Sequence, residues 1–513
     1  MSSEDTTETP INDGEARNVL PAIDTTAIYD VGFDSQNSDA EDSLLTADRV
    51  KKSHSTNSLN QSASDDASFS STLSVSMIGE PTEEEISIRQ RHLSLLVAEE
   101  EEYINSSSWR DQKRHFFVLT EAGKPVYSRH GSEDKLSSVM GVMLALVSCV
   151  HDRNDKIRSI TAGDHKFVFL IKIPLILVAV CSTPESITQI TVYLKYIYNK
   201  IVSIVTLKQL DRIYAKQKNF DLRRLLTGTD KFLDHLCTSM DTGPEYLLGA
   251  FQCLPLAGNI RDLVSQALQL SKTNDLAFAL LLTSGKTVSY CRLKEHNLHS
   301  SDLQILINLI TASSSFHAGE SWLPICLPHF NPQGFLHAHI SYLDDDFQTC
   351  LLLLSADVNS FFTLSEAKKR VMVKLNKHDC LPILKLASEK GMYNVGKIGL
   401  PDLRHFIYKS KHQSQFTAPE FSSPYHDVHQ QERLFGLYQH LHGKIHNPAI
   451  PLKLLFEVSD EETMLAWVAS GFELYVAFSP LVTKGQAISS VDRLLRWIKQ
   501  REDELFMIRP LVF

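Results

Sequence analysis

Hydrophobic and polar residues follow a pattern that occurs three times along the chain. Each copy begins with two apolar strands joined by a tight turn, followed by a helical segment whose apolar residues recur every 3.6 positions. Three more strands and a longer helix complete the copy. In the first copy the elements are expected at residues 115–120, 125–129, 136–150, 157–161, 166–172 and 175–181, with the last helix beginning at Pro184.

The turn of the first hairpin has a closely similar sequence in the second copy. The sequence LTEAGKPV at 119–126 recurs as LTSGKTV at 282–288, and the third copy is a looser version of the same order. The second copy is expected to have its elements at 276–283, 287–293, 301–314, 321–330, 335–343, 349–356 and 364–375. The third copy is expected to have its elements at 394–400, 403–411, 428–443, 453–458, 464–470, 473–479 and 487–505.

A repeat of this length predicts duplicated domains, because each copy contains enough strands and helices to bury its own core. The length of 513 residues also agrees with three or four domains. The sequence therefore predicts an α+β protein of three tandem domains, each an antiparallel five-stranded sheet flanked by helices. We expect these domains at residues 108–240, 273–380 and 390–513, with a helical connector at 241–272.

Acidic residues are concentrated at the start of the chain. Residues 1–100 contain 20 Asp and Glu against 6 Lys and Arg, whereas the remainder contains 41 against 45. The acidic segment is also rich in Ser and has only short apolar clusters. Such a composition buries too little apolar surface to offset the entropy lost on folding. Residues 1–107 are therefore expected to form a mostly disordered acidic tail.

Neither a signal peptide nor a membrane-spanning segment is predicted. The first residues, MSSEDTTETP, are acidic and lack an apolar stretch. The longest apolar run, at 173–181, contains Pro174 and is about half the length that crosses a bilayer. The eight cysteines form no CxxC pair and fall mostly in strands or apolar helices, which is typical of reduced core residues. These features predict a cytoplasmic protein.

Sequence motifs for catalysis are almost absent. The tetrapeptide SGKT at 284–287 resembles the end of a phosphate-binding loop, but Leu280 stands where that motif requires Gly. A strand is predicted after Lys286, whereas a phosphate loop leads into a helix. Neither a GxSxG nucleophile elbow nor a GxGxxG loop after a strand occurs. The SGKT segment is therefore interpreted as a hairpin turn, and no catalytic residue is predicted.

Histidines cluster near residues 426–446, where a zinc site would be conceivable. His426 and His429 share a helix face, whereas His440 and His442 do not, and no Cys lies nearby. Zinc sites need convergent ligands, usually including Cys or carboxylate groups. We therefore interpret these histidines as solvated helix residues and predict neither a metal site nor a cofactor.

The helix at 136–150 is unusual because its last twelve positions are apolar or small on all sides. A helix on one face of a sheet normally keeps a polar stripe, so both faces of this helix are expected to be covered. One interpretation is that a neighbouring segment of the chain, such as Phe220 to Leu226, covers it. The favoured interpretation is a contact with another protein. The predicted interface residues are Ser137, Met140, Gly141, Leu144, Ala145 and Ser148.

A run of basic residues lies along the last predicted helix of the second domain. It consists of Lys368, Lys369, Arg370, Lys374 and Lys377. Because Lys and Arg near an anionic leaflet each add about 1 kcal/mol to binding, this run predicts peripheral attachment to anionic or phosphoinositide membranes. A solvated helix face is the alternative interpretation. Arg404, Lys409 and Lys411 were considered as an extension of the run, and no nucleic-acid partner is expected.

Three segments carry a resemblance to a known family. The segment SWRDQKRHFFVLTEAGKPVYSRHGSEDKLSSVMGVMLALVSCV is the most specific, and KFVFLIKIPLILVAVCSTPES and DRLLRWIKQREDELFMI extend it. The order of strands and helices resembles longin domains. Three such domains behind an acidic tail resemble the SAND, or Mon-one, family of vacuolar fusion proteins. The resemblance covers about residues 108–513 and excludes the tail.

This resemblance implies a function that composition and spacing alone do not show. Members of the family pair through their first longin domains with a second three-longin protein, Ccz-one. The heterodimer is a guanine-nucleotide exchange factor for the late-endosomal Rab GTPase (Rab-seven), acting in endosome maturation and vacuole or lysosome fusion. A third, propeller-containing subunit is expected in animals.

The resemblance further implies recruitment from the cytoplasm to endosomal and late-endosomal membranes, and the acidic tail is expected to regulate exchange. The alternatives are a longin-type trafficking adaptor or scaffold without exchange activity, and an enzyme with an unrecognised site.

Overall fold

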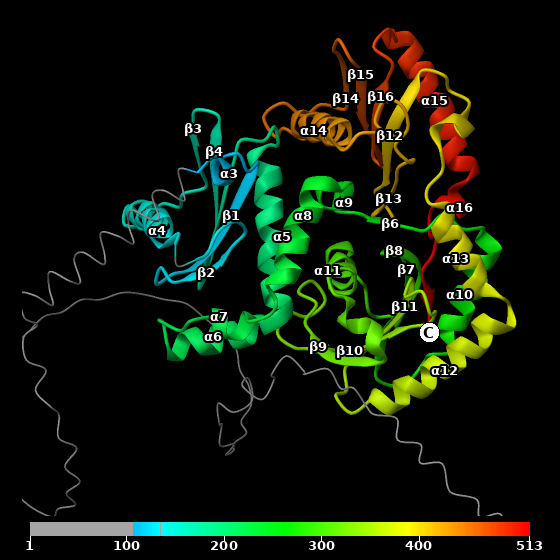
Figure 1. Ribbon diagram of the computed structural model, residues 1–513, viewed down its shortest axis with the longest axis horizontal. Helices are drawn as coiled ribbons and strands as arrows, with labels where there is room; N and C mark the ends of the chain where they lie inside the picture. The colour runs from blue at the N-terminus through cyan, green and yellow to red at the C-terminus, as the bar shows by residue number, and fades with distance from the viewer. Residues whose placement is uncertain (1–105, 134) are drawn as a thin grey trace, which may run out of the picture. The chain divides into compact units, whose positions relative to one another are not determined.

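The computed structural model describes residues 106–133 and 135–513, and nearly all of the predicted acidic tail lies outside these residues. The described part contains three mainly antiparallel sheets, one for each copy of the repeat (Figure 1). None of the helices in this part is long and apolar enough to cross a lipid bilayer. A single-turn helix, α3 (Ser107–Arg110), precedes the first sheet.

The first domain has a five-stranded sheet with a helix on each face (Figure 1). Along β1, Phe116 and Val118 point into the core under α5, whereas Phe117 and Leu119 point into the core under α4. The four central residues of the strand, 116–119, are all apolar because both of its faces are buried. In the order β2-β1-β5-β4-β3, the elements are β2 (Pro125–Ser128), β1 (Arg114–Thr120), β5 (Leu175–Cys181), β4 (His165–Lys172) and β3 (Ser159–Ala162), with α4 (Ser137–His151) and α5 (Ile187–Val205).

The second domain repeats this plan but has six strands, because the C-terminal segment adds β17 (Leu511–Val512) beside β8. The predicted five-stranded sheet is thus extended by a parallel strand from 220 residues further along the chain. In the order β17-β8-β7-β11-β10-β9, the other strands are β8 (Lys286–Arg292), β7 (Leu276–Thr283), β11 (Thr349–Ser355), β10 (Leu336–Tyr342) and β9 (Ser321–Ile325). Its helices include α11 (Ser300–Thr311), the short 3-10 helix η1 (Ser314–Ala318), α12 (Phe361–Lys377) and α13 (Cys380–Lys390).

The third domain also has a six-stranded sheet, but its first strand was predicted in the wrong place. Residues 394–400 do not form a strand, because the Asn394 side chain accepts a hydrogen bond from the Gly396 amide and the segment turns as the 3-10 helix η2 (Val395–Ile398). In the order β14-β15-β16-β12-β13-β6, the strands are β14 (Leu454–Val458), β15 (Thr463–Val468), β16 (Phe472–Phe478), β12 (Leu403–Ser410), β13 (Gln415–Thr417) and β6 (Phe251–Gln252). The helices are α14 (Val428–Ile445), α15 (Lys484–Gln500) and α16 (Glu502–Leu505).

The segment between the first two domains is helical, as expected, but also contains a strand. β6 pairs in parallel with β13 of the third sheet, and α10 packs against the second sheet beside β8 and α12. The connector therefore belongs to the cores of the other two domains. The elements at 241–272 are the end of α8 (Asp230–Thr242), α9 (Pro244–Leu248), β6 and α10 (Gly258–Gln269), whereas α6 (Leu207–Lys216) and α7 (Arg223–Leu226) precede them in the first domain.

A buried ionic network joins the first sheet to α8. Arg114 on β1 pairs with the fully buried Glu185 and with Asp241, which also pairs with Arg129. Two arginines and two carboxylates balance one another's charge, as buried ions require. The network fixes the edge of the first domain to the connector.

Candidate protein-interaction site

Helix α4 places only one narrow stripe of side chains against its own domain. Met140, Met143 and Val147 are buried against the sheet, at the 3,4 spacing of a single helix face. Met140 was predicted to face a partner, and this is wrong because its side chain is fully buried in the core beneath α4. Leu144, one turn further on, is half-buried and packs at the margin of the same stripe.

The opposite face of α4 is exposed and apolar in the described part of the chain. Val142 is 62% exposed and Leu146 is 38% exposed, and a Cβ atom built at Gly141 meets nothing within 4 Å. Four of the six predicted interface residues are exposed on this helix, namely Ser137, Gly141, Ala145 and Ser148, whereas Leu144 is half-buried and approaches Gly123. We define the α4 outer face as Gly141, Val142, Ala145, Leu146 and Cys149, which are all exposed.

The segment that was the alternative candidate to cover α4, Phe220 to Leu226, packs in a different core. Phe220 and Leu226 join the core under α5, on the opposite side of the first sheet from α4. The interpretation that this segment covers the small side chains of α4 is therefore wrong. One side of α4 remains open within the described residues, so the favoured expectation that another protein covers it stays a prediction.

The predicted basic run is mostly engaged within the chain. Lys368 Nζ pairs with Glu320 Oε1 at 2.9 Å, and hydrogen bonds from His339 and Lys368 hold the pKa of the Glu320 carboxyl at about 2. Lys369 pairs with Glu366 at 2.8 Å, and the Arg370 Nε donates to the Leu270 carbonyl. These contacts reduce the number of basic groups that are available to a lipid surface.

The remaining members of the basic run differ in their surroundings. Lys377 is exposed and Lys374 is half-buried on α12, next to the exposed Val373. The residues considered as an extension of the run belong to the third domain and contact acidic or carbonyl groups there. They are Arg404, which donates to the Glu461 carbonyl, and Lys409 and Lys411, which approach Glu473.

The SGKT segment forms the hairpin turn that its context predicts. Ser284 and Gly285 both have positive φ, at 49° and 74°, as the two central residues of a type I′ turn require. Strands β7 and β8 pair on either side of it. No helix N-terminus follows the turn, so it offers no cradle for a phosphate.

Seven of the eight cysteine thiols are buried within the described residues, where a substrate cannot reach them. Burial raises the pKa of Cys237, Cys291 and Cys350 to about 12, so these thiols stay protonated. Cys149 alone is exposed, on the α4 outer face.

The histidine segment contains one cluster that the sequence analysis missed. His442 lies in the last turn of α14 and His446 is its C-cap residue; their ring centroids are 4.4 Å apart with the rings tilted to one another, and His446 Nε2 lies 3.2 Å from Glu473 Oε2 on β16. The two histidines are four residues apart, which is the signal that could have found them. By contrast, His426 and His429, which had been singled out for a shared face, are exposed.

Three family models match the chain, one for each domain. They describe the first, second and third longin domains of FUZ, MON1 and HPS1, at residues 114–236, 274–373 and 402–502. The fold and these matches define a protein of three tandem longin domains, as the sequence predicted.

Known proteins with similar sequences match this chain over most of its length. The vacuolar fusion protein MON1 homolog A of Gallus gallus is 48% identical over 82% of this chain and 77% of its own length. Protein SAND of Takifugu rubripes is 47% identical over 80% of this chain and 79% of its own length. The human vacuolar fusion protein MON1 homolog B is 41% identical over 79% of this chain and 78% of its own length. The chain belongs to the MON1/SAND family of vacuolar fusion proteins.

Proposed function

We propose that this chain is one subunit of a heterodimeric guanine-nucleotide exchange factor for the late-endosomal Rab GTPase, acting in endosome maturation and vacuole or lysosome fusion. Membership in the MON1/SAND family supports a regulatory role in membrane fusion. The observation that carries the proposal furthest is the α4 outer face, an apolar surface on a helix whose other side is packed on its sheet. Apolar surfaces of this kind on soluble proteins usually mark partners.

The proposed partner at this face is the second three-longin protein. Gly141 and Ala145 lie one turn apart and carry almost no side chain, so another helix backbone can approach closely. Val142 and Leu146 flank them and supply apolar area to bury. The sheet beside α4 ends at β3, whose outer edge pairs with no described strand and offers free backbone groups for the same contact.

Exchange by this complex requires binding energy and no catalytic side chain. A Rab GTPase holds its nucleotide through a phosphate loop, Mg²⁺ and an ordered switch. A surface that binds the displaced switch more tightly than the ordered one lowers nucleotide affinity by that difference. A 10⁵-fold faster release corresponds to about 7 kcal/mol of such preference. The absence of recognised catalytic motifs in the sequence is compatible with this mechanism.

Membrane recruitment in the proposal is peripheral, from the cytoplasm. Helix α12 exposes Val373, which is 70% exposed, directly before Lys374 and one turn before Lys377. Apolar side chains beside basic ones suit the boundary of an anionic leaflet. A propeller-containing third subunit completes the proposed assembly in animals.

The test is nucleotide release from a panel of Rab GTPases, with this chain alone, with the second three-longin protein, and with both. We expect accelerated release only with both proteins, and only from the late-endosomal Rab. The double variant Val142→Asp and Leu146→Asp should lose pairing and exchange together, whereas Leu481→Asp, at an 89% exposed position of the third domain, should keep both. Pairing without any accelerated release would favour a trafficking adaptor or scaffold.

A further inference from the structure

We infer that the third longin domain contains a site for a zinc-class divalent metal ion, formed by His442, His446 and Glu473. His442 lies on α14, His446 caps the C-terminal end of that helix and Glu473 lies on β16, so the ion would link the end of the helix to the sheet on which it packs. None of the family or relative descriptions assigns a metal to this domain.

The positions of the three side chains are close to those of a metal site. Residues four apart on a helix lie on one face, one turn above the other, and the rings of His442 and His446 are 4.4 Å apart. One ligand atom from each of the three residues lies within 4.8 Å of the other two, and His446 Nε2 and Glu473 Oε2 are 3.2 Å apart. In a tetrahedral zinc site with bonds of about 2.0 to 2.2 Å, ligand atoms lie roughly 3.4 Å apart. Side-chain movements of about 1 Å would complete the geometry.

The three side chains offer ligand types that zinc binds, namely two imidazole rings and one carboxylate.

One polar atom in the cluster lacks a partner. His442 Nδ1 is buried and accepts or donates no hydrogen bond in the described part of the chain. Buried polar atoms in native proteins nearly always have a partner, and a bound ion is one explanation for an apparent exception. His446 remains exposed, so an ion and a water molecule can reach the cluster from solvent.

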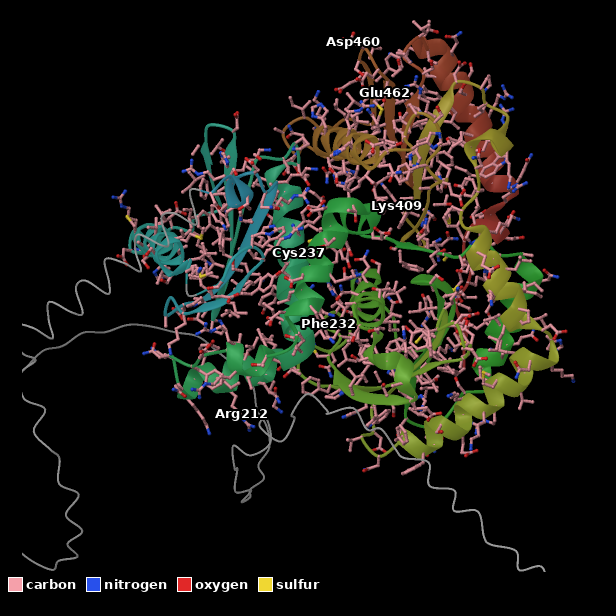
Figure 2. All side chains as sticks on the ribbon, in the orientation of Figure 1. Arg212, Phe232, Cys237, Lys409, Asp460 and Glu462 are labelled. Carbon is pink, nitrogen blue, oxygen red and sulfur yellow. The ribbon has the colours of Figure 1, made fainter. Side chains whose placement is uncertain are left out.

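Two positively charged side chains next to the cluster oppose the binding of a cation. Lys409 on β12 (Figure 2) and Lys411 lie 3.3 and 3.7 Å from Glu473 Oε1, which leaves Oε2 for the ion. The Tyr475 hydroxyl lies 3.3 Å from both Glu473 Oε2 and His446 Nε2, where it can support or complete the ligand set. The two lysines weaken cation binding, and without an ion they would form an ion-pair network with Glu473. Nitrogen ligands favour zinc over magnesium or calcium.

The experiment is calorimetric titration of the full chain, freed of metal by a chelator, with Zn²⁺ and separately with Mg²⁺. We expect one Zn²⁺ per chain, a higher melting temperature with zinc, and no response to Mg²⁺. His442→Ala should weaken zinc binding by more than the 10- to 100-fold that is typical of losing an outer-sphere contact. The matched control is His440→Ala on the same helix, where His440 pairs with Glu457 outside the cluster, and this variant should bind zinc within about twofold of the parent.

A second variant keeps the proposal testable if His442→Ala does not fold. Lys409→Met removes a positive charge near the carboxylate and should tighten zinc binding about tenfold or more. Absorption bands of bound Co²⁺ would report a tetrahedral nitrogen and oxygen site in the parent. The proposal is overturned if the parent binds no stoichiometric zinc, or if His442→Ala and His446→Ala both bind it as tightly as the parent.

Discussion

Helices α4 and α11 occupy the same place in the first and second longin domains, yet their outer faces differ. Ten of the twelve residues of α11 are buried, whereas only three of the fifteen residues of α4 are buried. The connector and α8 cover α11 through specific hydrogen bonds: Gln304 donates to the carbonyls of Glu245 and Ala250 in the connector, and Asn308 contacts His235 on α8. The outer face of α4 is more apolar and has no comparable cover among the described residues.

The difference shows that apolar composition alone does not indicate which helix the chain itself covers. The intramolecular cover of α11 uses polar side chains at defined positions, because a neighbouring backbone segment must have its hydrogen bonds satisfied. The outer face of α4 consists of small and aliphatic residues, which suit another helix better than an extended connector. Within the described residues, the helix that the chain itself covers is the one with polar side chains, and the helix with the apolar outer face stays open.

The largest expected loss of stability comes from shortening a buried side chain on α11, the covered helix. Leu306 on α11 is fully buried in the second core, so Leu306→Ala should lower the free energy of unfolding by about 2 to 5 kcal/mol. Leu146→Ala on the outer face of α4 should change it by only about 0.5 kcal/mol or less. Urea denaturation of the isolated chain measures both variants, and equal losses would show that the outer face of α4 is covered after all.

The next effect concerns pairing. Gly141→Leu adds bulk where two backbones are proposed to meet, which should cost about 1 to 3 kcal/mol of pairing energy by overpacking. The isolated chain should not lose stability, because the new side chain has free space and Leu favours a helix by up to about 1 kcal/mol over Gly. The matched control is Gly436→Leu on α14, where a Cβ atom also meets nothing within 4 Å. Thermal melting followed by affinity measurement with the second longin protein separates the outcomes, and a destabilised monomer that still pairs would contradict the interface.

A smaller change in stability is expected from Lys200, which is buried beside α8, one of the segments that cover α11. Lys200 on α5 is buried, lies 5.0 Å from the ring of Phe232 on α8 (Figure 2), and burial lowers its pKa to about 7. In the unfolded chain this lysine binds its proton up to about pH 10.5, so its burial costs stability increasingly as the pH falls from about 10.5 to 7, and by a constant amount below that. Lys200→Met should therefore stabilise the chain by about 1 to 2 kcal/mol at pH 6, with a smaller gain at pH 9. Denaturant unfolding at both pH values tests this, and Lys195→Met, at an exposed position on the same helix, should give no pH-dependent difference.

The smallest effect asks whether the open face of α12 in the second domain binds a membrane, as the open face of α4 is proposed to bind a protein. Reversing Lys368 would place a carboxylate beside Glu320 and disturb the fold, so the exposed Lys377 is the better choice. Lys377→Gln should weaken binding to anionic liposomes about fivefold at low salt. Lys499→Gln, at an exposed position of the third domain, serves as the control. If liposome sedimentation finds that both variants bind anionic liposomes as tightly as the parent, the exposed face of α12 is an ordinary solvated helix face.

The sequence predicted the features that depend on local periodicity. The hairpin at SGKT and the helices α4, α11 and α14 follow from alternation and 3.6-residue repeats over short distances. It did not predict β6 and β17, since two-residue strands have no periodicity of their own and form only because another sheet edge is near. It also missed the cluster of His442, His446 and Glu473, because the strand that supplies the carboxylate lies 27 residues beyond the nearer histidine.

The parallel strand β17 has a consequence for how the chain is made. Residues 511 and 512 complete the edge of the second sheet at β8, and Phe513 donates its amide to the Arg292 carbonyl. During synthesis β8 emerges from the ribosome more than 200 residues before this strand, so the end of its outer edge at Cys291 and Arg292 stays unpaired while the third domain is translated, whereas Thr287 on β8 can already pair with Cys253. Exposed strand edges invite pairing with other chains. The interval between residues 292 and 511 is therefore the stage of biosynthesis at which a nascent-chain chaperone would protect this protein most.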